Sequence, residues 1–277
     1  MTSFDIHQHL WPEQLIRALE ARRDLPRLRG NILELPEGSF ETDLGEHELD
    51  TRIALLDRYE IDVAVVSLQP TVACDLQPDL ADAYHEGMFQ LVEAAGGRIA
   101  ALACAERRDG FVGACVSARR VVAGLDELPG ELSEAGEVLF VHPGYPDPLP
   151  EGAPAWWAAV VDYTAQMQAA FAAWVARGAA ESPGLKIVFA VLAGGAPFQL
   201  ERLAARGDIG EVPANTYFDT ASYGARALRL TAEACGPDRL LFGSDSPVMD
   251  PQVSLSGLQK AGLIEAALHD NPGRVFA

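Results

Sequence analysis

Two histidines with a single residue between them follow the first apolar run of the chain. The opening residues read MTSFDIHQH, so His7 and His9 come directly after the run at 4–6. Residues two apart on a strand point to the same face, and two imidazoles side by side can bind one metal ion. The alternative is a pair of surface histidines near a disordered amino terminus. The spacing favours metal ligation.

Two further candidate ligands stand at the ends of apolar runs. His142 ends the run VLFV, and Asp245 follows LLFGS. Taken singly, His142 could be a buried structural histidine and Asp245 a helix N-cap. If the runs are parallel strands of one barrel, their carboxyl ends meet and these residues join the first histidine pair. Three imidazoles and one carboxylate suit Zn²⁺ or a similar divalent ion.

Short apolar runs alternate with helical stretches along the chain. We expect strands at 4–6, 62–68, 98–104, 138–141, 185–191, 216–219 and 240–243, with an eighth near 121–125. Helices are expected at 50–59, 78–95, 155–178, 197–206 and 224–234, and long loops at 24–47 and 143–155. This alternation predicts an α/β fold, a distorted (β/α)₈ TIM barrel that forms a single domain over residues 1–277.

Charge and composition argue against several classes of protein. The 277 residues include 40 acidic and 21 basic side chains, for a net charge of −19. Such a chain lacks the cationic surface that binds nucleic acid or anionic membranes. The hydrophobic fraction of 49 % is typical of a folded protein, and a small-molecule substrate is the expected partner. A homodimer is the default expectation for the assembly.

Motifs that the sequence lacks bear on where the protein is located and on which cofactors it binds. The amino terminus has no basic region before an apolar stretch, and the four cysteines show no C-x-x-C pair. We therefore expect reduced thiols and a cytoplasmic protein. The apolar stretch at 156–180 carries Asp162 and Arg177 and has helical spacing, so it is a core helix and not a membrane span. Neither a dinucleotide-binding nor a P-loop glycine motif is present.

The motifs together resemble the amidohydrolase superfamily. FDIHQHLWP, VHPG, NTYFDTAS, CGPDRLLFGSDSP and NPGRVF occur in the order of that superfamily, from residue 4 to residue 276. They are most similar to the branch with mononuclear metal hydrolases and the aminocarboxymuconate-semialdehyde and hydroxybenzoate decarboxylases. The resemblance implies that His7, His9, His142 and Asp245 are the metal ligands, and that Asp245 is also the catalytic proton-transfer group.

The chain departs from this superfamily in two places. Many members bridge two metal ions with a lysine after strand 4, whereas the chain has only Lys186 and Lys260, neither of which is placed there. One divalent metal ion is therefore expected, with zinc as the first choice. The branch also carries a histidine after strand 6 in a pattern H-x-G-G-x-x-P, and the matching position here is Val191. Its absence puts catalysis by the usual route in doubt.

Three functions are compatible with these residues. The main prediction is a metal-dependent hydrolase that acts on a small amide, lactone or similar carbonyl compound through a metal-activated water. The first alternative is a non-oxidative, metal-dependent decarboxylase of a small carboxylic acid, and the second is a non-catalytic metal- or ligand-binding barrel. Substrate contacts are expected from Gln69, Arg107 and Tyr223. His47, His85 and His269 are expected to be ordinary surface or packing residues.

Overall fold

The computed structural model describes residues 1–72, 77–207 and 209–276. Within these ranges Cys104 and Cys115 are buried thiols and Cys235 is partly buried, with none of them in a disulfide. The fourth cysteine, Cys74, lies outside the described residues. No helix in the described ranges is long and apolar enough to cross a membrane.

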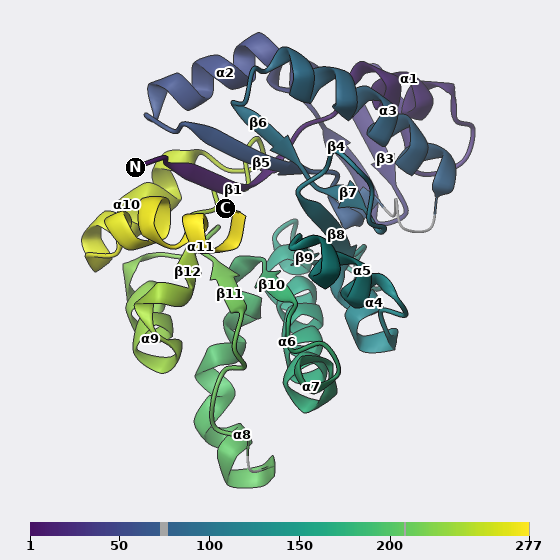
Figure 1. The fold of residues 1–277 in the computed structure, drawn as a ribbon. Coiled ribbons are helices and arrows are strands. Elements are labelled where there is room, and N and C mark those ends of the chain that lie inside the picture. Colours follow the sequence, from purple (N-terminus) through teal and green to yellow (C-terminus); the bar gives the residue numbers. More distant parts are fainter. Residues whose placement is uncertain (73–76, 208, 277) are drawn as a thin grey trace.

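Parallel strands form the centre of the molecule (Figure 1). One sheet has the order β1-β5-β6 and the other has the order β12-β11-β10-β9-β8-β7. Their bounds are Phe4–His9 (β1), Val63–Ser67 (β5), Ile99–Ala101 (β6), Ala103–Cys104 (β7), Gly113–Ser117 (β8), Val138–His142 (β9), Lys186–Phe189 (β10), Thr216–Asp219 (β11) and Leu240–Leu241 (β12). Most of these residues are buried, as expected for strands covered on both faces.

Hydrogen bonds at two places join the sheets into one ring. Only Leu102 separates β6 from β7, and its amide donates to the carbonyl of Val66 at 2.9 Å. At the other place, β1 meets the chain at and beyond β12. The amides of Ile6, Asp245 and His9 donate to Phe242, His7 and Ser246, at 2.9, 2.8 and 2.7 Å. The fold is thus the distorted (β/α)₈ barrel expected from the sequence.

Helices pack around the outside of this ring (Figure 1). Their bounds are Glu13–Ala21 (α1), Leu49–Arg58 (α2), Pro78–Ala94 (α3), Ala118–Ala123 (α4), Leu128–Ala135 (α5), Tyr163–Ala173 (α6), Ala179–Glu181 (α7), Leu200–Gly207 (α8), Ala225–Cys235 (α9), Pro251–Ala261 (α10) and Pro272–Phe276 (α11). Helix α6 continues a π-helical turn at Ala158–Asp162 and leads into another at Trp174–Gly178. Phe171 of α6 packs against Phe189 and Phe218 of the sheet, with ring centroids 5.6 and 5.7 Å apart.

The prediction of a strand near 121–125 is wrong. The strand after β7 is β8, Gly113–Ser117, and Val121 belongs to α4. Both segments are short and apolar, and a run of five residues has no period that separates a buried strand from one buried turn of helix. Ser117 caps α4 by accepting a hydrogen bond from the amide of Arg120 at 3.3 Å. That cap marks the point at which the strand gives way to the helix.

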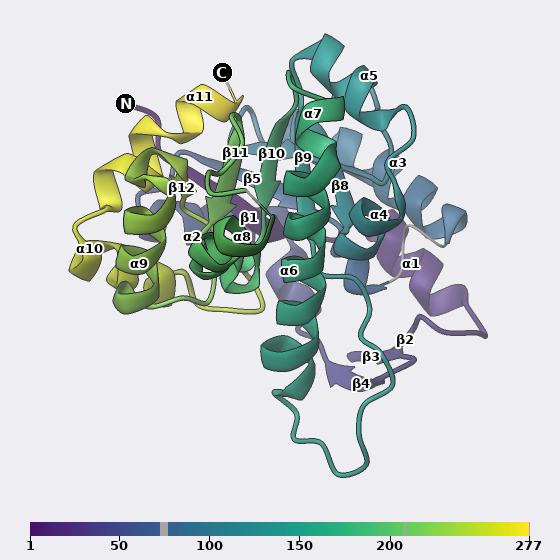
Figure 2. The same ribbon diagram turned by 90° about the horizontal axis from the view of Figure 1, so that it is seen from below.

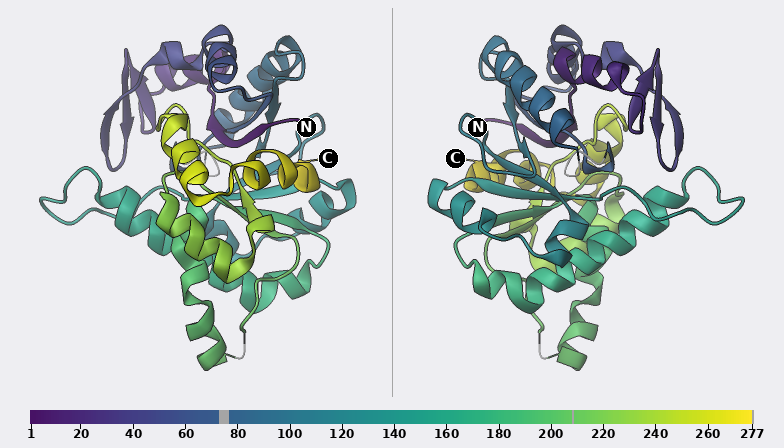
Figure 3. Two further views of the ribbon diagram at one scale, coloured as in Figure 1. Left: turned by 90° about the vertical axis from the view of Figure 1, so that its left-hand side faces the viewer. Right: turned by 90° about the vertical axis from the view of Figure 1, so that its right-hand side faces the viewer.

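The segment at 24–47 contains a small sheet where we predicted a loop. Strands β2 (Arg27–Arg29), β3 (Ile32–Leu35) and β4 (Gly38–Glu41) pair antiparallel. Strands of three or four residues between glycines and a proline give a weak sequence signal. The segment at 143–155 is the long loop that we expected. Figures 2 and 3 show that this sheet and this loop project from the same side of the molecule.

Candidate metal centre

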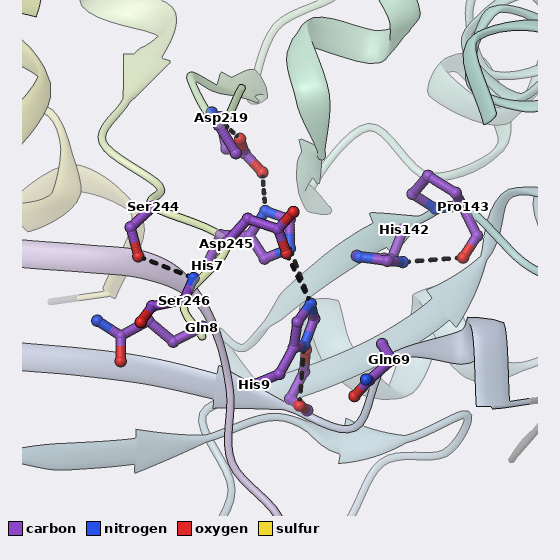
Figure 4. Close-up of polar contacts among 12 residues, drawn as sticks. His7, Gln8, His9, Gln69, His142, Pro143, Asp219, Ser244, Asp245 and Ser246 are labelled. Carbon is purple, nitrogen blue, oxygen red and sulfur yellow. Dashed lines mark hydrogen bonds and ion pairs between the residues drawn. The ribbon is translucent and has the colours of Figure 1, made fainter. Parts of the chain in front are cut away.

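The structure brings together the four residues that were predicted as metal ligands (Figure 4). His7 and His9 lie in β1, His142 ends β9, and Asp245 follows β12. One ligand atom from each lies within 4.8 Å of the others. All four lie at or near the carboxyl ends of barrel strands. Parallel strands present these ends on one face of a barrel, and this is why the four side chains meet.

Hydrogen bonds fix the tautomer of each histidine. Nδ1 of His7 lies 2.6 Å from Oδ2 of Asp219, and Nδ1 of His9 lies 3.2 Å from the carbonyl oxygen of Ser67. Nδ1 of His142 lies 2.8 Å from the carbonyl oxygen of Pro143. A carbonyl or an ionised carboxylate only accepts, so each Nδ1 must carry the hydrogen. The neutral form of each ring then leaves a lone pair on Nε2.

These lone pairs and a carboxylate face one another. Nε2 of His7 lies 3.3 Å from Nε2 of His9, and Oδ1 of Asp245 lies 3.5 and 3.1 Å from the same two nitrogens. Electron pairs this close repel unless a proton or a metal ion lies among them. Neutral imidazole nitrogens and a carboxylate oxygen are ligands that Zn²⁺, Mn²⁺ and similar ions take. The donor set therefore fits a divalent metal ion.

Burial and charge shift the pKa values of the group in different directions. Burial disfavours the charged form of His7, but the carboxylates of Asp219 and Asp245 outweigh it and raise its pKa to about 9. Burial lowers the pKa of His9 and of His142. For Asp245, burial is opposed by the three histidines, with His7 foremost, and its pKa falls below the usual value. Asp245 is therefore ionised, and its side chain is 17 % exposed.

A buried network holds the backbone of the ligands in place. Arg52 in α2 is fully buried and donates to Oε1 of Gln8 at 2.6 Å and to the carbonyl of His9 at 3.2 Å. The side-chain Nε2 of Gln8 donates to Oδ2 of Asp5 at 2.7 Å. The other oxygen of Asp5 accepts from the amide of Ser244 at 2.9 Å. Burial raises the pKa of Asp5 to about 6.

The three predicted substrate contacts lie at different distances from this group. Gln69 follows β5 on the same face of the barrel as His9 (Figure 4). Tyr223 follows β11, and burial, together with the charge of Asp219, raises the pKa of its hydroxyl. Arg107 pairs with Asp109 and with Glu137, which immediately precedes β9 at the amino end of that strand. The structure thus does not bring Arg107 to the metal centre.

Val191 begins a stretch of left-handed backbone. The φ angles from Val191 to Gly195 are 47, 51, 51, 62 and 77°. For non-glycine residues this conformation costs energy, and most for a β-branched one. The predicted strand at 185–191 therefore ends early, at Phe189. Val191 is partly buried against the core and lies outside the metal-binding group.

Sequence reasoning missed several residues around the site. Asp219 is the last residue of an expected strand, and it contacts His7. Its place at a strand end was the feature of the sequence that could have indicated a role in the site. Arg52 gave no signal, because an arginine in an amphipathic helix is typical of an exposed face. His47 was placed among acidic residues and expected to be ordinary. It is in fact buried and lines a cavity of about 420 Å³ together with Trp11 and Gln69.

Comparison with known proteins identifies the family and the fold. A family model described as Amidohydrolase matches residues 4–277. No curated protein sequence is significantly similar to the chain. Among solved structures, the chain is similar to apo IDCase from Metarhizium anisopliae, with TM-score 0.76 and 21 % identity over 99 % of this chain and 97 % of that one.

Two further solved structures are named as decarboxylases. 5-Carboxyvanillate decarboxylase from Sphingomonas paucimobilis has TM-score 0.71 and 16 % identity, over 99 % of this chain and 98 % of that one. A dihydroxybenzoic acid decarboxylase from Polaromonas sp. JS666 has TM-score 0.67 and 15 % identity, over 99 % and 96 %. The latter structure contains manganese and the inhibitor 2-nitroresorcinol. At these identities the likeness shows a shared fold.

Proposed function

Because the chain belongs to the amidohydrolase family, a family of enzymes, we propose that it is a metal-dependent, non-oxidative decarboxylase of a small aromatic carboxylic acid. The observation that carries the proposal is the group of three histidine Nε2 atoms and the Asp245 carboxylate, at the mouth of the barrel. The decarboxylases among similar structures support the choice of reaction. The main prediction from the sequence, a hydrolase, becomes the second candidate.

Proton transfer falls to Asp245 in either reaction. Hydrolysis removes one proton from water and delivers one to the leaving group, which a single carboxylate can do in turn, whereas loss of CO₂ needs one proton delivered to carbon. Asp245 is the one residue of the group that is not fully buried, and the position after strand 6 is the apolar Val191. Membership of an enzyme family argues against a non-catalytic barrel.

Each residue then has a defined role. His7, His9, His142 and Asp245 hold one divalent ion, Zn²⁺ or Mn²⁺, which when bound supplies a positive charge for the oxygens of the substrate. Asp245, which is ionised at rest, first takes a proton from solvent and then passes it to the ring carbon that bears the carboxylate. The bond from that carbon to the carboxylate carbon breaks, its electron pair stays on the ring, and CO₂ leaves. Asp245 is then ionised again.

Release of CO₂ from candidate acids is the direct test. The purified protein is loaded with Zn²⁺ or Mn²⁺ and given a panel of hydroxybenzoates, with lactones and amides assayed for acid release in parallel. Decarboxylation by the wild type and its loss in Asp245→Asn would support the proposal. Acid release from a lactone or amide without CO₂ from any carboxylic acid would establish the hydrolase instead.

Three further expectations from the sequence stay predictions. They are that residues 1–277 form one domain, that the protein is a homodimer, and that it is cytoplasmic.

A further inference from the structure

The cavity beside the metal centre has walls from five separate parts of the chain. It has a volume of about 420 Å³, within the range for small-molecule sites. Trp11 stands two residues after His9, Pro247 stands two residues after Asp245, and Leu33 belongs to the small antiparallel sheet. Lining residues thus stand two positions from two of the four proposed ligands, and the charge of His9 acts on His47 in the cavity wall.

His47 in this cavity has a fixed tautomer. Its Nδ1 lies 3.2 Å from the backbone nitrogen of Trp11, and the two rings stack with centroids 4.6 Å apart. A backbone amide only donates, so Nδ1 of His47 must accept and carries no hydrogen. Burial, with Arg52 and His9, lowers the pKa of His47 to about 3, which keeps the ring neutral. Its hydrogen is therefore on Nε2.

The same tryptophan fixes the orientation of Gln69. The indole nitrogen of Trp11 lies 3.0 Å from Oε1 of Gln69. Because an indole N–H only donates, the amide must turn its oxygen toward the tryptophan and its NH₂ group away from it. Trp11 thus uses its backbone and its side chain to make two neighbouring residues hydrogen-bond donors.

The charge of the cavity limits which oxygens can meet these donors. Its walls carry Glu37, Glu41, Asp43 and Glu46, and in the described part of the chain no lysine or arginine is among its lining residues. Oε2 of Glu37 is buried and has no hydrogen-bond partner in the same part, and burial raises the pKa of this carboxyl. A second carboxylate on the substrate would meet like charges without a counter-ion.

We propose that His47 and Gln69 position the substrate by donating hydrogen bonds to an uncharged oxygen, a carbonyl or a hydroxyl, that lies away from its reacting carboxylate. Trp11 is the residue that fixes both donors. The substrate class is then a monocarboxylic acid with a neutral oxygen substituent. A dicarboxylic acid is disfavoured by the acidic walls. The inference rests on the proposed function for the carboxylate at the metal ion.

Ligand binding separates this inference from the reaction. Calorimetry on the Zn²⁺-loaded protein compares benzoate, its three monohydroxy isomers and benzene-1,3-dicarboxylate, with CO₂ release followed separately. At least one hydroxy isomer should bind about 2- to 10-fold more tightly than benzoate, the worth of one neutral hydrogen bond. The dicarboxylate should bind more weakly than benzoate. If no compound binds, or if the dicarboxylate binds most tightly, the inference is overturned.

Two substitutions of His47 separate positioning from structural support. Asparagine can still accept from the backbone of Trp11 but has no donor near the position of Nε2, whereas glutamine can place an amide donor there. His47→Asn should abolish the advantage of the hydroxy isomer and leave benzoate within about 2-fold, and His47→Gln should retain part of that advantage. His269→Asn is the matched control outside the cavity.

Equal weakening of benzoate and hydroxybenzoate binding in both His47 variants would show that His47 has a structural role only. A retained ranking without any CO₂ release would refute the decarboxylase and leave the binding site.

Discussion

Nδ1 of His7 lies 2.6 Å from Oδ2 of Asp219, although 212 residues separate the two in the chain. Both side chains are fully buried. The carboxylate fixes the hydrogen of His7 on Nδ1 and turns Nε2 toward the other ligands. A metal-ligating histidine commonly has such a partner, which orients the ring and increases its basicity.

Replacing Asp219 should weaken metal binding without removing a ligand. In Asp219→Asn the amide oxygen can still accept from His7, but the negative charge is lost. We expect Zn²⁺ affinity to fall about 10- to 100-fold. A chelator competition titration measures the change. Asp238→Asn, at an exposed acid paired with Arg274, is the control and should match the wild type.

The affinity for the metal ion should depend on pH through His7. Its pKa is raised to about 9, so below that pH the metal-free site carries a proton that an incoming ion must displace. Affinity should therefore rise about tenfold for each pH unit between roughly 7 and 9, and level off above. Titrations with chelator-buffered Mn²⁺ at several pH values measure the slope. A flat profile between 7 and 9 would contradict this protonation state.

The left-handed stretch should tolerate alanine at one glycine and not at its neighbour. At Gly194 a Cβ atom would lie 2.5 Å from the backbone oxygen of Thr164, which cannot move without displacing α6. At Gly195 the nearest atom is Cδ2 of Phe198, 3.2 Å away on a side chain that is 45 % exposed. Both φ angles are positive, so each variant loses about 1–2 kcal/mol.

The clash adds to this loss only at Gly194. Gly194→Ala should lower the free energy of unfolding by at least about 1 kcal/mol more than Gly195→Ala. Urea denaturation of the two variants side by side measures the difference. Equal losses would mean that the packing of this turn against α6 is looser than the structure has it.

Arg52 should contribute to stability through the acceptors to which it donates. Arg52→Met would leave Oε1 of Gln8 and the carbonyls of His9 and Glu46 without this donor, at about 1–3 kcal/mol for each buried unsatisfied group. A loss of at least about 3 kcal/mol in urea denaturation is expected. Arg17→Met is the control, since Arg17 is 71 % exposed and pairs only with Glu13. That variant should stay within about 0.5 kcal/mol of the wild type.

That the four candidate ligands come together was predictable, because their positions depend on strand ends. Each of His7, His9, His142 and Asp245 stands at or just after an apolar run, and the barrel geometry converts these separate ends into one site. Asp219 stands at the end of such a run too. Its role could not be read from the sequence, because a carboxylate there can face the centre, cap a helix or meet solvent.

The rest of the site depends on tertiary contacts. Nothing local distinguishes Arg52 from the surface arginines of other helices, because most of its acceptors, on Gln8, His9 and Ser246, lie far away in the chain. His47 was expected to be ordinary because its neighbours are acidic. Its burial comes from Trp11, which lies 36 residues earlier. Such contacts have no periodic signature in the chain.

Candidate ligand residues take part in two of the backbone hydrogen bonds that join β1 to the chain beyond β12. The amide of Asp245 donates to the carbonyl of His7, and the amide of His9 donates to that of Ser246. An ion held by these side chains would therefore bridge the first and last strands of the ring. Its binding energy would oppose opening of the barrel between β1 and the chain beyond β12. Amide hydrogen exchange at His9 and Asp245 should then slow together when the metal ion is added, even though the two residues stand near opposite ends of the chain.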